Sequence, residues 1–514
     1  MFPSRSLIVL CSVASATVAS AQTPLFVTLP TGSHVTDVAT DAASGEPVAV
    51  GTLSSGDAFR WTPSSGVVAL GPVASGSEVN CSYDGSVIAA DTVGMDLVTR
   101  ASLWSGGTSW TQLPGIGGTS GNVATVTDGV SGDGSAVVGL GWVSAGSAHG
   151  FRWTQALGSV DLGTTPSGGS SRARGVNADG SFIVGWQDGS GRQGARWVNG
   201  VESVFTYTNP SNVTFACGAA QSVNADGTIV VGTQILGGDT SAWRWDAASG
   251  AVTLLANLAG ETTKASANDV TDDGSIVVGN NGGSFLNSKA LIWIQGAVQN
   301  YHAYLTSLGV TGLGTYTQLG IATAISRDGR VVGGWGSQLG GAPNGGWVVY
   351  VPLPGHAFCF GDGALADHTT PCPCGNSGAN GHGCAHSFNA AGAQIGASGV
   401  VANDDVILQA SSLPVTSFTL FLQHDAAGDT IFHDGTLCAG GTLVRLRGRA
   451  AVAGAATFPN NAFAQDSTLT LSQRGGVAPG SGALRYYSAW FRNASSTFCP
   501  PATANVTNGY TIVW

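Results

Sequence analysis

The sequence predicts an all-β protein: a seven-bladed β-propeller followed by a disulfide-stapled β-sandwich or jelly-roll domain. Three observations predict this fold. A segment of about 40–50 residues recurs seven times between residues 22 and 355, six cysteines gather after residue 356, and 78 glycines accompany only 10% charged residues. This composition is typical of β proteins with many turns, and not of helical or disordered chains.

The first 21 residues have the pattern of an export signal peptide. Arg5 precedes a short apolar run from Leu7 to Val13, and the small residues of "ASA" at 19–21 form a cleavage site. No later apolar run approaches the roughly 18 residues that span a bilayer. We therefore expect a secreted or cell-surface protein without a membrane span.

An Asp-Gly pair between two apolar runs marks each complete copy of the repeat. Such a pair is a strong hairpin signal, because the turn needs residues that tolerate positive φ. A degenerate first copy has Ser44-Gly45 at the turn. The other six turns, spaced by 49, 46, 47, 47 and 55 residues, are Asp84-Gly85, Asp133-Gly134, Asp179-Gly180, Asp226-Gly227, Asp273-Gly274 and Asp328-Gly329. We expect turn formers here and not calcium ligands, since each loop supplies at most two carboxylates.

Each copy predicts four short strands. The third strand ends in an aromatic mark, as in "DAFRW" at 57–61 and "HGFRW" at 149–153, whose tryptophan we expect in the core between neighbouring sheets. Four strands cannot bury both faces of a small sheet, whereas seven such sheets stacked around an axis can. The repeat therefore predicts a propeller over residues 22–355.

The last copy lacks a fourth strand. It ends at "GGWVVYVP" (345–352), while the chain begins with "LFVTLPTGS" (25–33), which matches fourth-strand segments such as "WTQLPGIGG" (110–118). We expect the N-terminal segment to supply the outer strand of the last blade, because that closure leaves no unpaired sheet edge.

The repeat resembles the extracellular HAF-repeat family, whose units combine an Asp-Gly or related turn, "VVG", an aromatic "HAFxW"-like strand and "LG". The nearest local match is "AHGFRW" at 148–153. The resemblance covers about two thirds of the chain. It implies an exported or surface β-propeller, and it implies no catalytic residues.

Residues 356–514 form a different, cysteine-rich domain. Alternating segments such as "SFTLFLQH" and "ALRYYSAWFRN" predict a β-sandwich. Six cysteines in an exported domain indicate three disulfides, with fifteen pairings open. They are Cys359, Cys372, Cys374, Cys384, Cys438 and Cys499. A metal site within "CPCGNSGANGHGCAH" is the rival reading, and its Cys-x-Cys spacing departs from the usual zinc pattern.

Two further cysteines, Cys81 and Cys217, lie within the repeats. Cys81 occupies a position that valine fills in other copies, so we expect it to be buried, and the two are too far apart around the ring to pair.

The C-terminal segments "FCFGDG", "CPCGNSG" and "NGYTIVW" resemble a Cys-rich domain of secreted planctomycete proteins. That resemblance implies a module appended to exported proteins for surface retention, with no known chemistry.

Charge and motifs exclude several functions. The formal net charge is −11 with no basic patch, which argues against nucleic acid and anionic membranes as partners. There is no Gly-x-Ser-x-Gly elbow and no His-Glu-x-x-His motif. Acidic or histidine side chains converging on the axis would indicate an enzyme. The sequence shows no such cluster, and its few glutamates (Glu46, Glu78, Glu202 and Glu261) suggest no carboxylate pair for glycoside cleavage.

The loops on one face of the predicted propeller suggest a binding surface. They are polar, hydroxyl-rich and weakly charged, with Trp142 and Trp186 near them, so they can bind a sugar through aromatic stacking and neutral hydrogen bonds. The alternative is that they are ordinary solvated loops.

Three functional hypotheses follow. The first is an exported, non-catalytic monomer whose propeller binds a glycan or surface protein, or serves surface architecture, without metal or cofactor. The second is a secreted carbohydrate-active lyase or hydrolase with its site at the propeller mouth. The third is a propeller that acts only as a spacer.

Overall fold

The computed structural model describes residues 24–41, 45–144, 146–165, 169–189, 191–234, 241–261, 265–282, 288–339, 344–352, 354–365, 368–495, 497–501 and 503–514. The predicted export signal and Ser44 of the first turn lie outside these ranges. The chain divides into two compact units, with the principal division between Val351 and Pro352. Within the described residues, no helix combines the length and apolar character needed to cross a membrane.

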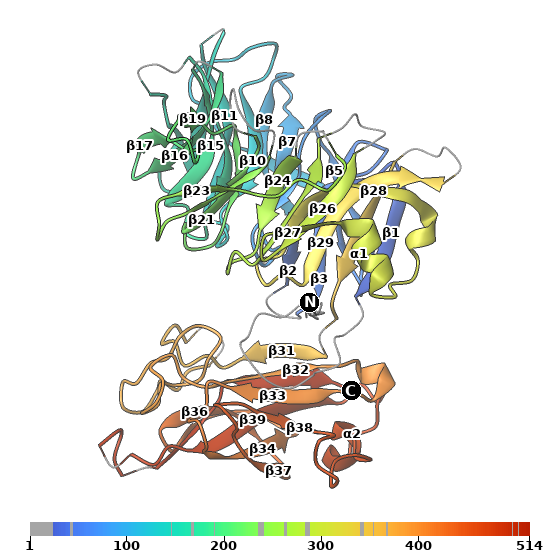
Figure 1. The fold of residues 1–514 in the computed structure, drawn as a ribbon, viewed down its shortest axis with the longest axis vertical. Helices are drawn as coiled ribbons and strands as arrows, with labels where there is room; N and C mark the ends of the chain where they lie inside the picture. Colours follow the sequence, from blue (N-terminus) through green and yellow to red (C-terminus); the bar gives the residue numbers. More distant parts are fainter. Residues whose placement is uncertain are drawn as a thin grey trace. The chain divides into compact units, whose positions relative to one another are not determined.

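The first unit contains seven four-stranded antiparallel sheets, which confirms the predicted β-propeller (Figure 1). The innermost strands are β2 (His34–Thr40), β6 (Asn80–Cys81), β10 (Thr125–Val130), β14 (Ser171–Val176), β20 (Ala220–Val223), β24 (Ala265–Val270) and β28 (Tyr316–Ile325). The second strands are β3 (Pro47–Thr52), β7 (Ile88–Val93), β11 (Ala136–Ser144), β15 (Phe182–Asp188), β21 (Ile229–Gly232), β25 (Ile276–Asn281) and β29 (Val331–Gln338).

The third strands are β4 (Asp57–Thr62), β8 (Thr99–Gly106), β12 (Ser147–Thr154), β16 (Arg192–Val198), β22 (Trp243–Asp246), β26 (Lys289–Ile294) and β30 (Gly345–Tyr350). The outer strands are β5 (Gly66–Pro72), β9 (Ser109–Gln112), β13 (Gly158–Asp161), β17 (Val201–Val204), β23 (Val252–Leu254), β27 (Ala297–Asn300) and β1 (Leu25–Thr31). We number the blades one to seven in the order of their innermost strands.

The seventh blade takes its outer strand from the N-terminal part of the chain. Strand β1 pairs antiparallel with β30, from Leu25 opposite Tyr350 to Thr31 opposite Gly345. Leu29 is the buried residue of β1, and it packs in the core between blades seven and one. The N-terminal segment and the last repeat are therefore joined within one hydrogen-bonded sheet.

The Asp-Gly aspartates act as turn formers, as predicted. In each turn, an Oδ1 atom accepts the N–H two residues further on; Asp133, for example, accepts from Ser135 at 2.8 Å and Asp328 from Arg330 at 3.0 Å. The following glycines have φ between 67° and 76°, a left-handed conformation that costs glycine little. Among the third-strand tryptophans, Trp104 is half-buried, and the buried ones are Trp61, Trp153, Trp197, Trp243, Trp245, Trp293 and Trp347.

Two local elements of the propeller were not expected from the sequence. Helix α1 (Tyr301–Ser307) follows blade six, with the Asn300 side chain capping its N-terminus and Tyr301, Tyr304 and Leu305 buried. This spacing is helical, but the repeat pattern led us to expect only strands. The helix leads to a 3-10 turn at Leu313–Thr315. A small hairpin, β18 (Thr206–Thr208) and β19 (Thr214–Ala216), stands where a simple connection was expected.

The second unit is a β-sandwich, as predicted. One sheet contains β31 (Gly355–Phe358), β34 (Phe418–His424), β37 (Val444–Ala450), β39 (Leu484–Arg492), β40 (Ala504–Val506) and β41 (Gly509–Val513). The facing sheet contains β32 (Gln394–Ser398), β33 (Ile407–Ser411) and β38 (Ala456–Phe458). Additional elements are the β35 (Ala426–Phe432) and β36 (Gly435–Gly440) hairpin, a 3-10 turn at Val401–Asn403 and helix α2 (Leu471–Gly475).

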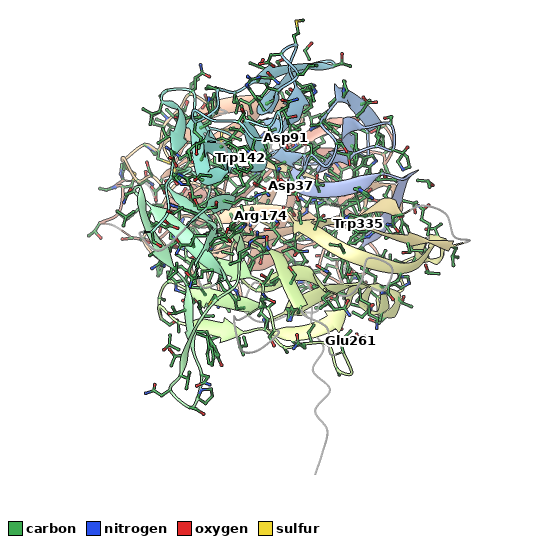
Figure 2. All side chains as sticks on the ribbon, turned by 90° about the horizontal axis from the view of Figure 1, so that it is seen from above. Asp37, Asp91, Trp142, Arg174, Glu261 and Trp335 are labelled. Atoms are coloured by element: carbon green, nitrogen blue, oxygen red, sulfur yellow. A yellow bond between two sulfur atoms is a disulfide. The ribbon has the colours of Figure 1, made fainter. Side chains whose placement is uncertain are left out.

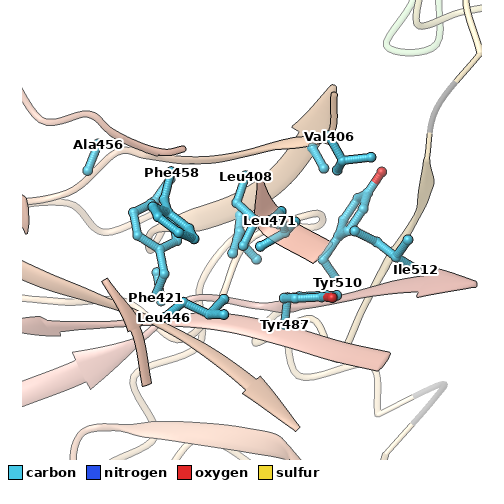
Figure 3. Close-up of a cluster of buried hydrophobic side chains, with 14 of the residues drawn as sticks. Val406, Leu408, Phe421, Leu446, Ala456, Phe458, Leu471, Tyr487, Tyr510 and Ile512 are labelled. Carbon is cyan, nitrogen blue, oxygen red and sulfur yellow. The ribbon is translucent and has the colours of Figure 1, made fainter. Parts of the chain in front are cut away.

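The core of the sandwich lies between these two sheets. Figure 3 shows Leu408 and Phe458 of the smaller sheet facing Phe421, Leu446 and the tyrosines of the larger sheet, all within one buried cluster. Alternation along each strand places these side chains on the inner faces, which accounts for the sandwich.

Three disulfides join the six cysteines of the second unit: Cys359–Cys438, Cys372–Cys384 and Cys374–Cys499. His368 lies close to Cys359 and Cys438, but those sulfurs are bonded to each other and are not free to ligate a metal. Cys81 and Cys217 are buried and unpaired, as predicted.

Candidate functional site

The innermost strands of the propeller share a β-bulge that directs side chains toward the axis. In six blades the pairing with the second strand shifts register. The shifts lie between Val35 and Asp37, Thr127 and Gly129, Ala173 and Gly175, Ala220 and Ser222, Ala267 and Asp269, and Ala322 and Ala324, and blade seven has two more shifts earlier in its innermost strand. A bulge of this kind re-aims neighbouring side chains. Here it allows two consecutive residues of one strand to face the axis.

These residues line a cavity of about 460 Å³ on the axis. We call one group of its lining residues, one from each blade, the axial ring. The axial ring consists of Thr36, Glu78, Asp128, Arg174, Gln221, Asn268 and Thr323. Figure 2 shows Arg174 near the centre of the circle of blades, whereas Glu261 lies at its rim. Asp37, which is not a member of the axial ring, also lies near the centre. Trp335 and Asn280, from second strands, also line the cavity.

Three members of the axial ring are used to join neighbouring blades. Thr36 Oγ1 donates to Val79 O at 2.6 Å, and Thr323 Oγ1 donates to Val35 O at 3.0 Å. Asn268 Nδ2 donates to the carbonyl oxygen of Ala322 at 2.9 Å. Each bond leads from one blade to the next, so these side chains have a structural role.

Buried carboxylates make a second set of bonds between blades. Asp37 Oδ2 accepts the N–H of Cys81 at 2.9 Å, and Asp269 Oδ2 accepts the N–H of Ile325 at 2.9 Å. Burial raises the pKa of Asp37 to about 7, although the bond from Cys81 opposes this shift. A carboxylate placed in this way satisfies a backbone donor that would otherwise be unpaired inside the ring.

The acidic side chains on the axis correct our sequence analysis, which found no such cluster. Asp37, Glu78, Asp128 and Asp269 all line the cavity. They come from different blades. Asp37 and Asp269 occupy the same position after the bulge of their strands, whereas Glu78 and Asp128 stand at other positions of the repeat. Most of them are already engaged in bonds to the protein, so their convergence is not by itself evidence of an acid–base pair.

A charged network connects blades two, three and four. Asp128 accepts two hydrogen bonds from Arg172, from Nε at 2.7 Å and from Nη2 at 2.6 Å. Arg174 Nη1 lies further away, 3.5 Å from Asp128 Oδ1 and 3.6 Å from Glu78 Oε2. Burial raises the pKa of Glu78, and the neighbouring Arg174 opposes the shift.

The axial ring therefore contains three side chains with spare hydrogen-bonding capacity. Among the described residues, the carboxylate of Glu78 has only the long contact with Arg174, and the side chain is 49% exposed. The guanidinium of Arg174 has, within the described part of the chain, only the two long contacts just given. Gln221 is half-buried, and its amide makes no hydrogen bond to the described residues. These three residues, from blades two, four and five, are the ones available to a ligand.

At the Asp-Gly end of the axis, two large side chains cross the cavity. Arg327 Nη1 donates to Val270 O at 2.6 Å, and its guanidinium lies 4.6 Å from the centroid of the Tyr83 ring. Tyr83 in turn packs against Gly132, where an added Cβ would lie 2.4 Å from the ring. The chain of contacts thus runs from blade six through blades seven and two to blade three and forms the floor of the cavity.

Hydrogen bonds between neighbouring turns surround this floor. Backbone N–H to carbonyl bonds link Thr40 to Tyr83, Tyr83 to Gly132, Asp133 to Ala178, Ala178 to Ala225, and Asp272 to Arg327. Side chains complete the circle, since Ala225 N–H donates to Asp272 Oδ1 and Thr40 Oγ1 to Asp328 Oδ2. This turn circle draws the innermost strands together at one end of the axis.

The two tryptophans predicted to bind a ligand are not among the residues that line the cavity. Trp186 is 6% exposed, and Arg192 covers its ring at 3.8 Å. Trp142 is half-buried on β11. The tryptophan that does line the cavity is Trp335, whose ring centroid is 5.0 Å from that of His34. Trp335 and Trp186 each follow a closely packed glycine of a second strand. An alignment of the repeats therefore places Trp335 at the position of Trp186 and could have indicated it as a candidate.

A positional signal for the axial ring exists in the sequence. Asp128, Arg174, Gln221, Asn268 and Thr323 each stand five residues before the aspartate of an Asp-Gly turn. The position is polar in these five copies but differs in every one. An alignment of the copies on their shared residues does not reveal this position, because no residue type is common to it.

The chain matches no protein-family model and no curated protein. Similar solved structures are β-propeller proteins. An oligogalacturonate lyase in complex with manganese is 12% identical, with a TM-score of 0.39, over 64% of this chain and 98% of that one. The β-propeller domain of the Trilobed protease from Pyrococcus furiosus is 10% identical, with a TM-score of 0.38, over 62% and 95%. TolB from Acinetobacter baumannii is 15% identical, with a TM-score of 0.32, over 52% of this chain and 63% of its own length. The likeness concerns the fold alone.

Proposed function

We propose that this is an exported, non-catalytic binding protein whose propeller takes a saccharide ligand into the axial cavity. The observation that carries the proposal is the spare hydrogen-bonding capacity of Glu78, Arg174 and Gln221, which face one polar cavity from three blades. Saccharides are recognised by planar polar groups and by an aromatic ring, and Trp335 supplies such a ring in the same wall.

Export and a surface location belong to the same proposal. Three disulfides fit an oxidising compartment, as does the signal-like sequence at residues 1–21. We further propose that the repeats are of the HAF type and that the cysteine-rich sandwich is a module for surface retention. The ligand is then a glycan displayed outside the cell.

The bonding of the carboxylates favours binding over catalysis. Both oxygens of Asp37 accept backbone N–H groups, and both oxygens of Asp128 accept from Arg172. A general acid or base needs access to a substrate proton, and these bonds occupy the oxygens that would provide it.

A secreted lyase or hydrolase is the second candidate function. One observation favours it: Glu78 and Asp37 line the same cavity, and burial raises the pKa of both, that of Asp37 to about 7. Groups with a pKa near neutrality are suited to proton transfer. Reducing-end assays on any bound saccharide, with wild-type protein and Glu78→Gln, separate a binding protein from an enzyme.

A glycan array probed with the mature full-length protein tests the proposed function. Gln221→Trp fills the cavity without removing a hydrogen bond between described residues, so we expect it to abolish saturable binding. Trp142→Ala, outside the cavity wall, is the matched control and should bind like wild type. Binding that Gln221→Trp leaves intact would place the site elsewhere and contradict the proposal.

A further inference from the structure

The shape and charge of the axial cavity narrow the class of ligand. Resting on the proposed function, we propose that the cavity takes the free end of a neutral saccharide chain, with adjacent hydroxyls of the terminal unit held between Glu78 and Arg174.

Glu78 and Arg174 form an acceptor next to a donor. Arg174 Nη1 and Glu78 Oε2 are 3.6 Å apart, too long for a hydrogen bond between them. An ionised carboxylate only accepts and a guanidinium only donates. A hydroxyl does both, so two adjacent hydroxyls can donate to Glu78 and accept from Arg174. Gln221, with one donor and one acceptor group, can bind a third hydroxyl.

The charges around this pair are balanced. Arg172 lies against Asp128 with two short bonds, and Arg174 lies between Asp128 and Glu78. Two guanidiniums therefore match the two carboxylates that they contact, and Asp91, a further carboxyl that interacts electrostatically with Asp128 and Arg172, adds no positive charge. An acidic sugar would add a third negative charge beside Glu78 and Asp128, and a partly desolvated repulsion of that kind disfavours binding. A neutral sugar leaves the balance unchanged.

The cavity admits a chain end and not an internal segment. Tyr83 and Arg327 form its floor, and the turn circle surrounds them, so a ligand enters from the opposite end, where Trp335 lies. A volume of about 460 Å³ is near the lower end of the range for small-ligand pockets. It holds only a short terminal piece, and the rest of the saccharide stays outside.

Competition measurements on the mature full-length protein test this inference. The probes are neutral linear oligosaccharides of increasing length, cyclic oligosaccharides of the same units, and linear uronate-containing oligosaccharides. We expect short linear neutral chains to compete as well as long ones, and cyclic chains to compete poorly. Glu78→Gln and Arg174→Gln should each weaken binding about 10-fold or more, since each removes a hydrogen bond to a charged group. Arg192→Gln, a matched exposed arginine outside the cavity, should bind like wild type.

The outcomes separate this inference from the proposed function. Equal competition by cyclic and linear chains would overturn end-on entry. A preference for uronates would overturn neutrality, while saturable binding blocked by Gln221→Trp would still support the proposed function. Binding unaffected by Glu78→Gln and Arg174→Gln would overturn the role of this pair. Circular dichroism of each variant distinguishes lost binding from lost folding.

Discussion

The substitution Gly185→Ala tests why "VVG" recurs in the second strands. Gly185 lies on β15, opposite Ala173 of the bulged strand β14. A Cβ atom added there would lie 2.0 Å from Arg172 O, roughly 1.5 Å inside the optimal separation of about 3.5 Å for non-bonded atoms. Corresponding glycines in other blades, among them Gly139 and Gly279, show an approach of 1.9 Å. The glycine is therefore required by the bulge.

The expected cost follows from this geometry. Overpacking a core by a methyl group costs about 1–3 kcal/mol. The opposing atom is backbone and cannot turn away, which puts this site near the upper end of that range. Replacing glycine in a strand regains about 0.5–1 kcal/mol. We therefore expect Gly185→Ala to lower the free energy of unfolding by about 2 kcal/mol, and to displace Arg172 from Asp128.

Urea unfolding at 25 °C, followed by tryptophan fluorescence, measures this change, because most tryptophans lie in the propeller. The control is Gly169→Ala, at an exposed glycine with no heavy atom within 4 Å of the added Cβ. The reasoning is refuted if Gly185→Ala and Gly169→Ala unfold within about 0.5 kcal/mol of each other.

Three further predictions concern the carboxylates, the closing strand and the disulfides. Burial raises the pKa of Asp91 to about 7, so the folded protein holds this proton more tightly than the unfolded chain does. The contribution of Asp91 to stability therefore falls as the pH rises from about 4 to about 7. Asp91→Asn should change the slope of the unfolding free energy against pH by up to about 1.4 kcal/mol per pH unit, and an unchanged slope would contradict this. Leu29 in β1 is 3% exposed, so Leu29→Ala should lower the free energy of unfolding in urea by about 2–5 kcal/mol. Leu25 in the same strand is 47% exposed, and Leu25→Ala should lower it by less than about 0.5 kcal/mol. A disulfide that closes a longer loop restricts the unfolded chain more. Removing Cys374–Cys499, whose cysteines are 125 residues apart, should therefore cost about 5 kcal/mol of unfolding free energy, and removing Cys372–Cys384, whose cysteines are 12 apart, about 3 kcal/mol. Hydrogen exchange of β39 in urea measures both costs, and the reverse order would contradict this reasoning.

The architecture was predictable because its signals are local and repeated. Each Asp-Gly pair fixes a hairpin through its own side chain and the following glycine, as at Asp133-Gly134, and seven copies establish the blade count. Helix α1 occurs once, after blade six, and a single seven-residue helix has no repetition to reveal it. The pairing of six cysteines depends on strand positions in space, which spacing along the chain does not give.

The candidate site was largely missed because its residues are different in each copy. Arg174 and Gln221 occupy equivalent positions, and both face the axis only because a bulge turns their strands. The bulge itself has no marker in the sequence beyond the closely packed glycine opposite. The tryptophans Trp142 and Trp186 attracted attention by residue type, while burial and the Arg192 contact determine what Trp186 can do.

The axial ring has a consequence for how a ligand of the proposed kind would be oriented in the cavity. The scaffold has approximate sevenfold rotational symmetry, and seven identical ring residues would offer a ligand seven equivalent poses. Here a carboxylate, a guanidinium and an amide, at Glu78, Arg174 and Gln221, stand at unequal angular intervals around the axis. The seven orientations about the axis are then no longer equivalent, and a ligand of the proposed kind would prefer one of them. None of the three side chains holds neighbouring blades together by a short hydrogen bond. Substitutions at these positions can therefore change the preferred orientation of a ligand while the propeller fold stays the same.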